Sequence, residues 1–279
     1  MAHEDPRQWP QIFYGTAWKQ AATTDLTDQA IAAGFRAVDT ANQPQHYHES
    51  DVGEGIALAL ARRGVCREQL FIQTKFSPLH AQGREVPYTR RADAAQQVEE
   101  SLAGSLAHLR TEYLDALLLH APRHPRRMAA ADWETWAVFE EAYRRGTVRR
   151  IGVSNMGVEH LRELLERADV PPMAVQNRCF ARTQWDREVR SLCAHHGVAY
   201  QGFSLLTANP FVTEQGEVRR IAQLHEVTPA QIVFAFARGV GMIPLTGTTN
   251  PRHMVEDLAA MRITLDANEL RLIEHIAAD

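Results

Sequence analysis

The sequence predicts a closed barrel of eight parallel strands surrounded by helices, the (β/α)8 or TIM barrel class, formed by residues 1–279 as a single domain. Three observations predict it. Short apolar runs alternate with helical patterns eight times, which is typical of a parallel sheet. Residues 114–119 are apolar almost throughout, as expected of a strand buried on both faces. No Gly-x-Gly-x-x-Gly follows the first strand, which favours a closed barrel over a doubly wound sheet.

Each element is expected from its own local pattern. The strands are expected at residues 11–15, 35–38, 70–74, 114–119, 148–153, 173–176, 198–203 and 241–244. The helices are expected at residues 23–33, 52–63, 92–109, 133–145, 158–168 and 185–196, from about 228, from 251, and at 267–278. Gly34 and Gly64 end two helices, Asp132 is expected to cap the fourth, and Pro229 suits a first helical position. Residues 76–90 form a long irregular loop, and such loops are usually functional or mobile.

Composition excludes several classes of protein. The chain is 45% hydrophobic and 23% charged, which is ordinary for a globular protein. A net charge of −4 gives no electrostatic reason to expect nucleic acid or a membrane surface as partner. No apolar run approaches the roughly 18–20 residues that span a bilayer, and the first residues, Met1 to Pro6, lack a signal-peptide pattern. The three cysteines, Cys66, Cys179 and Cys193, are far apart and fit reduced thiols. We therefore expect a cytoplasmic protein, monomeric or weakly oligomeric.

Polar residues gather where the expected strands end. They are Asp39, Lys75, His120, Ser154, Asn155, Gln176, Asn177, Phe203, Ser204 and Thr246, of which only Phe203 is apolar. In a (β/α)8 barrel the loops after the strands carry the function. Each of these residues alone also fits a surface cap or a turn, and His120 alone fits a buried core histidine. Their common placement favours a site.

Four of the residues in this region suit one reaction. Reduction of a carbonyl by hydride leaves an alkoxide that must be protonated. Tyr47 can supply the proton, although the reference pKa of tyrosine is about 10. The ammonium of Lys75, held by Asp39, is expected to lower the pKa of Tyr47 by stabilising the phenolate. A neutral His120 can orient the carbonyl oxygen and stabilise its developing charge.

Short motifs stand in order at successive strand ends. They are Gly15-Thr16-x-Trp18-Lys19, Val38-Asp39-Thr40-Ala41 with Tyr47, Thr74-Lys75, Leu114-Asp115 through His120, Gly152-Val-Ser154-Asn155, Val175-Gln176-Asn177, Phe203-Ser204 and Ile243-Pro244. At these residues the chain resembles the aldo-keto reductase superfamily over almost its full length. The resemblance implies an NAD(P)H-dependent carbonyl reductase with Tyr47 as general acid, Lys75 and Asp39 as its partners, and His120 as the carbonyl orienter. Its substrate would be a small carbonyl or alcohol.

The resemblance also implies a cofactor site. Its expected members are Gly15, Thr16, Ser154, Asn155, Gln176, Phe203, Ser204, Leu206, Thr246, Thr248, Thr249, Arg252, His253 and Asp257. Ser154, Asn155 and Gln176 would hold the nicotinamide carboxamide, and Phe203 would stack on the ring. Leu245 stands where the family often has a lysine that grips the 2′-phosphate. Because a Gly/Thr-rich loop at a helix N-terminus still favours an anion, NADP(H) is the favoured cofactor, with NAD(H) as the alternative.

The substrate pocket is expected between the first strands and the long loop. Its wall candidates are Trp18, His46, Tyr88, Pro122 and Phe211. The loop from Asp39 to Tyr47 is longer than the family pattern, and we expect no counterpart of the family's tail after the last helix. The resemblance therefore implies an open pocket, unless residues 76–90 cover it.

Two rival hypotheses stay open. His46-x-His48, with His120 and His124, has nitrogen donors for a metal-dependent hydrolase, but barrel metal sites need ligands that converge from several strand ends. A barrel that binds nicotinamide without catalysis, as a sensor or subunit, would result if the longer loop misplaced Tyr47. A metal assay and a turnover assay with an aldehyde separate these hypotheses.

Overall fold

Eight parallel strands close into a barrel in chain order in the computed structural model, which describes residues 9–277. The strands are β1 (Phe13–Gly15), β2 (Ala37–Asp39), β3 (Phe71–Phe76), β4 (Ala116–Leu119), β5 (Ile151–Ser154), β6 (Ala174–Arg178), β7 (Ala199–Phe203) and β8 (Met242–Thr246). The closing pair joins β1 to β8, with Phe13 opposite Leu245. The (β/α)8 class expected from the sequence is confirmed.

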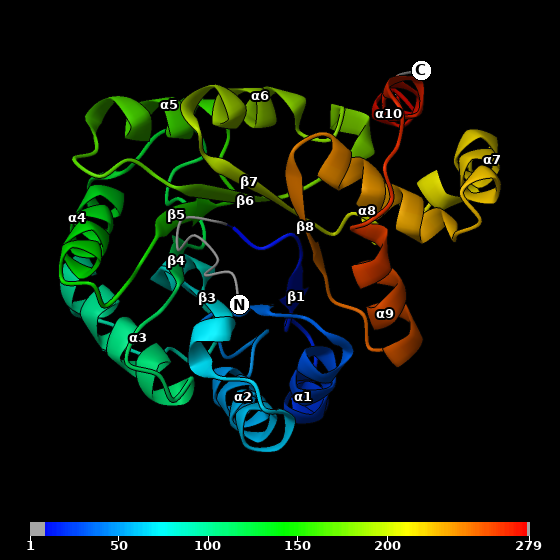
Figure 1. The fold of residues 1–279 in the computed structure, drawn as a ribbon. Coiled ribbons are helices and arrows are strands. Elements are labelled where there is room, and N and C mark those ends of the chain that lie inside the picture. The colour runs from blue at the N-terminus through cyan, green and yellow to red at the C-terminus, as the bar shows by residue number, and fades with distance from the viewer. Residues whose placement is uncertain (1–8, 278–279) are drawn as a thin grey trace.

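Helices alternate with the strands and surround the barrel (Figure 1). They are α1 (Thr23–Ala33), α2 (Glu49–Arg63), α3 (Ala94–His108), α4 (Ala130–Arg144), α5 (Val158–Arg167), α6 (Arg187–His196), α7 (Gly216–Leu224), α8 (Pro229–Gly239), α9 (Pro251–Ala260) and α10 (Ala267–Glu274). Among the described residues, α7 is the one α-helix that the sequence pattern did not predict. It is short and follows a turn-rich stretch, and its apolar face is only Val218, Ile221 and Ala222. None of the helices within residues 9–277 has the length and apolar character that crossing a membrane requires.

Several element boundaries differ from those expected. β3 continues to Phe76, so Lys75 lies inside this strand and not after it. α4 begins at Ala130, so Asp132 is its third residue and not its cap. The Asp132 carboxylate still accepts from the backbone N–H of Ala129, at 3.0 Å. The expected end of the last helix, Ala278, and the chain start lie outside the described residues.

The two faces of the barrel strands differ in polarity. Gln73 on β3 and Gln201 on β7 are fully buried, and their amides bond each other across the barrel interior, at 2.8 and 3.0 Å. Their chain neighbours Ile72 and Tyr200 belong to the apolar core. Side chains alternate between the two faces of a strand, so the apolar core fills the layer between strands and helices, while Gln73 and Gln201 face the barrel interior.

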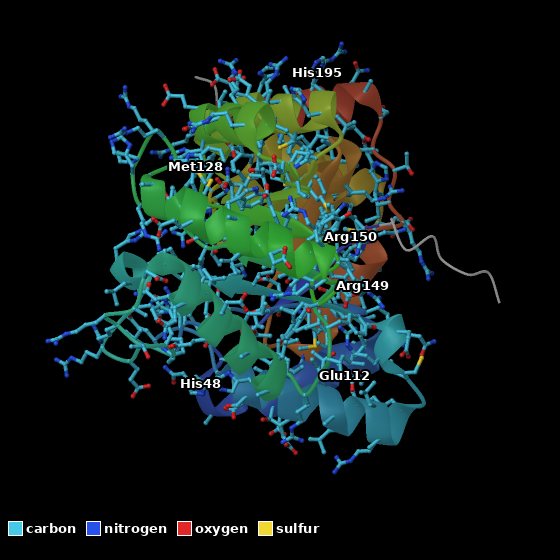
Figure 2. All side chains as sticks on the ribbon, turned by 90° about the vertical axis from the view of Figure 1, so that its left-hand side faces the viewer. His48, Glu112, Met128, Arg149, Arg150 and His195 are labelled. Carbon is cyan, nitrogen blue, oxygen red and sulfur yellow. The ribbon has the colours of Figure 1, made fainter. Side chains whose placement is uncertain are left out.

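The two ends of the barrel are separated in Figure 2. His48 and Met128, in the segments after β2 and β4, lie at the left of this view. Glu112, Arg149 and Arg150, which precede β4 and β5, lie toward the right. The carboxyl ends of the strands therefore face left, and the loops that carry the predicted site are on that side.

Candidate active site

A cavity of about 1000 Å³ opens at the carboxyl ends of the strands. The predicted residues that line it are Gly15, Trp18, Asp39, His46, Tyr47, His120, Ser154, Asn155, Gln176, Phe203, Ser204, Leu206, Thr246, Thr248, Arg252, His253 and Asp257. They come from all parts of the chain, and the barrel brings them together. A second cavity, of about 700 Å³, lies among Trp9, Phe71, Arg149 and Arg150 and contains none of the predicted site residues.

A buried ion pair lies beside the cavity. Lys75 Nζ donates to Asp39 Oδ2 at 2.6 Å and to the carbonyl oxygen of Thr40 at 2.8 Å. Lys75 and Asp39 are almost completely buried. Burial lowers the pKa of the Lys75 ammonium, and the charge of Asp39 opposes that loss. Because removal of one partner would leave an unpaired buried charge, the two residues act as a unit.

Tyr47 lies over this ion pair. Lys75 Nζ is 5.4 Å from the centre of the Tyr47 ring, and the ring of His120 meets that of Tyr47 edge-on, with 6.0 Å between centres. Burial raises the pKa of the Tyr47 phenol well above its ordinary value, and the charge of Asp39 raises it further. The expectation that Lys75 would lower this pKa is therefore wrong. Since Asp39 balances the ammonium at close range, burial dominates, and the phenol keeps its proton.

His120 is a neutral imidazole. Burial lowers its pKa to about 3, and the positive charge of Lys75 lowers it in the same direction. Its Nδ1 lies 2.6 Å from Ser77 Oγ. The hydroxyl thus holds one ring nitrogen and leaves Nε2 free to interact with a ligand. This lowered pKa agrees with the neutral state expected for this residue.

Ser154, Asn155 and Gln176 form the next part of the cavity wall. Ser154 Oγ donates to the backbone oxygen of Gln176 at 2.7 Å. The Asn155 amide nitrogen donates to the His120 carbonyl at 2.9 Å and to Ser154 Oγ at 3.2 Å. The Gln176 amide nitrogen donates to Asp39 and Gln201, both at 2.9 Å. The side-chain amides of Asn155 and Gln176 have two N–H groups each, and all of these are engaged. Each amide therefore has only its carbonyl oxygen left for a ligand.

The far end of the cavity is formed by the segment between β8 and α9. Thr246 Oγ1 donates to Asp257 at 2.7 Å, and burial raises the pKa of that carboxyl to about 6. Arg252 and His253 are exposed on the first turn of α9. Lys19 reaches across from the loop after β1 and donates to the Gly247 carbonyl. Cationic side chains therefore lie beside a helix N-terminus at this end.

Some predicted residues lie elsewhere. Tyr88 belongs to the loop between β3 and α3 and is buried. Its hydroxyl donates to the Ser77 carbonyl at 2.8 Å, and its ring packs on Phe76. It fills the base of that loop and not the cavity wall, because the loop folds back on itself. Thr16 is also buried and donates to the Asp39 carbonyl at 3.0 Å. Thr249, Pro122 and Phe211 are outside the wall as well.

Other residues of the site were missed by the sequence reasoning. Gln73 and Gln201 lie under the cavity floor and contact Asp39 or Gln176. A glutamine inside an otherwise apolar strand is the signal that could have identified them. Arg178, whose guanidinium lies 5.7 Å from the Phe203 ring, and Phe180, which is 41% exposed, also line the cavity. Arg178 is the last residue of β6 and Phe180 follows it by two residues, so neither stands out from a turn in the sequence.

The histidines considered as metal ligands do not converge. His48 Nδ1 pairs with Asp51 at 3.1 Å on the surface. His46 Nδ1 contacts Gln43 Oε1 at 2.7 Å, and its ring packs at a tilt against that of Trp18, with 4.1 Å between centres. Within residues 9–277 no group of three or more His, Cys, Asp or Glu side chains could hold a metal ion.

Comparisons with known proteins show which family this chain is similar to. Residues 12–278 match the family described as the Aldo/keto reductase family. The putative methylglyoxal reductase DkgA of Salmonella typhi is 28% identical over 96% of this chain and 89% of its own length. The glyoxal reductase of Bacillus subtilis is 27% identical over 92% of this chain and 84% of its own. A crystal structure of an aldo-keto reductase complexed with NADPH superposes with a TM-score of 0.80 at 22% identity, covering 96% of this chain and 84% of that one, which shows a shared fold.

Proposed function

This chain belongs to the aldo/keto reductase family, and on that premise we propose that it reduces small aldehydes or ketones with NADPH, using Tyr47 as the proton donor. Two of its relatives are named for the reduction of methylglyoxal and of glyoxal, which are small reactive dicarbonyls. We extend that substrate class to this chain. The cavity is large enough for a dinucleotide and a small carbonyl, and its wall offers the groups that each of them needs.

The cavity wall fits a nicotinamide dinucleotide. The free acceptors are the carbonyl oxygens of Asn155 and Gln176, since their N–H groups are engaged. Two acceptors match the two N–H groups of a primary carboxamide. Phe203 offers a ring face nearby. The coenzyme, when bound, supplies the hydride to the carbonyl carbon.

The opposite end of the cavity supports NADPH over NADH. Arg252 and His253 stand on the first turn of α9, where the helix N-terminus also favours an anion. A 2′-phosphate is such an anion. The Asp257 carboxyl, beside Arg252 and His253, accepts from Thr246 Oγ1 at 2.7 Å. NADH remains the alternative, because Leu245 provides no charge.

Tyr47 would protonate the oxygen of the substrate. Its phenol keeps its proton at neutral pH because burial and Asp39 disfavour the phenolate. An alkoxide is a stronger base than a phenolate, so transfer from Tyr47 to the new alkoxide runs downhill. Because the buried phenolate is disfavoured, it would then take a proton back from water.

His120 would orient the carbonyl. When Ser77 Oγ donates to Nδ1, the proton of the neutral ring resides on Nε2, and that N–H can bond the carbonyl oxygen. A neutral donor stabilises developing negative charge without competing with Tyr47 for the proton transfer. The observation that best supports the proposal is the grouping of Tyr47, His120 and the buried Lys75–Asp39 pair at one end of a cavity whose other wall offers carboxamide acceptors.

The experiment is the substitution Tyr47→Phe, assayed with methylglyoxal and NADPH. Loss of a general acid typically lowers turnover by roughly 10²–10⁴-fold, so we expect kcat to fall by at least about 100-fold. Coenzyme affinity, measured by fluorescence titration with NADPH and NADH side by side, should change by less than about twofold, because Tyr47 contributes only its hydroxyl to the chemistry.

The matched control is Tyr113→Phe. The Tyr113 hydroxyl is buried without a hydrogen-bond partner and lies near Arg67 and Arg149, at the opposite end of the barrel. Its removal should leave kcat unchanged. Retention of more than half the activity in Tyr47→Phe would remove Tyr47 from the mechanism. Coenzyme binding by the wild type without turnover of any aldehyde would instead favour the non-catalytic sensor.

A further inference from the structure

Three glutamine side chains from three strands form a cluster under the cavity floor, and two of them bond the carboxylate of Asp39. Gln73 Nε2 donates to Asp39 Oδ1 at 2.7 Å and to Gln201 Oε1 at 2.8 Å. Gln176 Nε2 donates to the same two oxygens, both at 2.9 Å. Gln201 Nε2 returns a bond to Gln73 Oε1 at 3.0 Å. Gln73 and Gln201 are completely buried, and Gln176 is 3% exposed.

The direction of every bond in this cluster follows from Asp39. Its carboxylate pairs with the Lys75 ammonium at 2.6 Å, and a carboxylate in an ion pair can only accept hydrogen bonds. Gln73 and Gln176 must therefore turn their nitrogens toward it. The second N–H of each amide then needs an acceptor, and Gln201 Oε1 serves both. Gln201 is held in that orientation because its own nitrogen bonds Gln73.

The consequence for the cavity is a fixed polarity at Gln176. Both of its N–H groups point into the cluster, so the group that it presents to the cavity is its carbonyl oxygen. If Gln176 turned over, its oxygen would face Asp39 Oδ1 at hydrogen-bond distance with no proton between them. Without Gln201, one N–H of Gln176 would lack a partner in a buried site, and rotation toward the cavity would relieve that loss.

We propose that Gln73 and Gln201 are positioning residues that fix the amide of Gln176 with its oxygen toward the coenzyme, so that the site selects a hydrogen-bond donor on the pyridine ring. This inference rests on the proposed function. The site should bind a ligand with a primary carboxamide more tightly than an analogue in which a methyl ketone replaces the carboxamide, because the ketone has no N–H. The selection also depends on the Asp39–Lys75 pair, which anchors the cluster.

The test measures the affinity of two coenzymes by calorimetric titration, without any turnover. It compares the wild type with three variants. The ligands are NADP⁺ and its 3-acetylpyridine analogue, in which a methyl ketone replaces the carboxamide. We expect the wild type to bind NADP⁺ about tenfold more tightly, as one lost hydrogen bond at a buried acceptor predicts. Gln201→Met and, independently, Gln73→Met should each reduce that ratio to about twofold or less, because methionine keeps the volume and removes the amide.

Gln97→Met is the matched control. Gln97 is also a buried glutamine whose amide nitrogen makes two bonds, to the carbonyls of Arg90 and Ala92, but it lies on α3 and outside the cavity. Loss of the Gln97 amide should leave the ratio of the two coenzyme affinities unchanged. Circular dichroism identifies any variant that does not fold, and the two glutamine positions provide separate tests.

Three outcomes overturn the inference. A wild type that binds both coenzymes equally would show that Gln176 does not select a donor. A tenfold ratio that persists in both variants would show that Gln73 and Gln201 do not act through Gln176. A wild type that binds neither coenzyme would remove the proposed function together with the inference, whereas the first two results leave the proposed function intact.

Discussion

His120 and Tyr47 lie in one wall of the cavity, and burial sets the protonation state of both. The pKa of His120 falls to about 3, and the pKa of Tyr47 rises. Both shifts favour the neutral form, which is the form that each residue needs in order to donate a hydrogen bond or a proton. Lys75 and Asp39 lie in the same surroundings, where they pair at 2.6 Å and each offsets the buried charge of the other.

The lowered pKa of His120 predicts a loss of stability in acid. Between its ordinary pKa of about 6.5 and its value of about 3 in the folded protein, the unfolded chain binds a proton that the folded chain does not. The free energy of unfolding should therefore fall as the pH drops through this window, by up to about 1.4 kcal/mol per pH unit from this residue. Above pH 6.5 the contribution of His120 to the free energy of unfolding is fully present.

Urea unfolding of the wild type and of His120→Gln at pH 7.5 and pH 5 measures this effect. The wild type should lose more stability on acidification than the variant, by about 1–2 kcal/mol. His195→Gln, which changes an exposed histidine on α6 (Figure 2), should lose as much stability on acidification as the wild type does. Equal losses in the wild type and His120→Gln would refute the assignment of this acid sensitivity to His120.

At the scale of elements, close packing of helices holds the loop that carries Tyr47. α2 begins directly after that loop, and its Gly53 faces the end of α3. A Cβ added at Gly53 would lie 1.9 Å from the backbone oxygen of His108 and 3.0 Å from Leu109 Cα. Both contacts are with backbone, so neither can be relieved by a change of rotamer. The glycine allows the two helices to approach.

Gly53→Ala is therefore expected to lower the free energy of unfolding by about 2–3 kcal/mol, because α2 must move away from α3. Gly216→Ala, at the first residue of α7, is the control, since its added Cβ would meet no atom within 4 Å. That substitution should raise stability by roughly 0.4–1 kcal/mol through a less flexible unfolded chain. Chemical denaturation followed by circular dichroism measures both. A neutral Gly53→Ala would contradict the packing assigned to these helices.

At the scale of the whole molecule, closure of the barrel joins the first strand to the last. Phe13 pairs with Leu245 and Tyr14 with Thr246, so the cavity is completed only when both ends of the chain are in place. Lys19 and Tyr14 reinforce this closure by donating to the carbonyls of Gly247 and Thr248. Interior residues should therefore become accessible in a cooperative transition.

The three thiols report on that cooperativity. Cys66 is exposed, while Cys179 and Cys193 are buried, and burial raises the pKa of each buried thiol to about 12. We expect one thiol to react rapidly with a disulfide reagent in the native protein and two to react only as fast as the protein unfolds. Cys66→Ser should abolish the fast phase. Rapid reaction of two or three thiols in the native state would show that the barrel opens locally.

Much of the site could be predicted because strand ends are visible in the sequence. Asp39, His120, Ser154 and Phe203 each end or follow an apolar run, and in a barrel such positions converge. Tyr88 was misplaced because its aromatic ring fits a pocket wall and a loop core equally well. α7 was missed because its apolar face is three residues long.

The sequence by itself determined the order of strands and helices, the fold class and the set of chemical groups at the strand ends, since these follow from local periodicity and from the sign and polarity of single side chains. Only the tertiary structure decided how those groups are charged and oriented. The rise in the pKa of Tyr47 and the fixed amide of Gln176 depend on burial and on partners such as Gln201, 25 residues away along the chain. Such partners meet only when the barrel closes, because desolvation and hydrogen-bond direction are properties of the assembled interior.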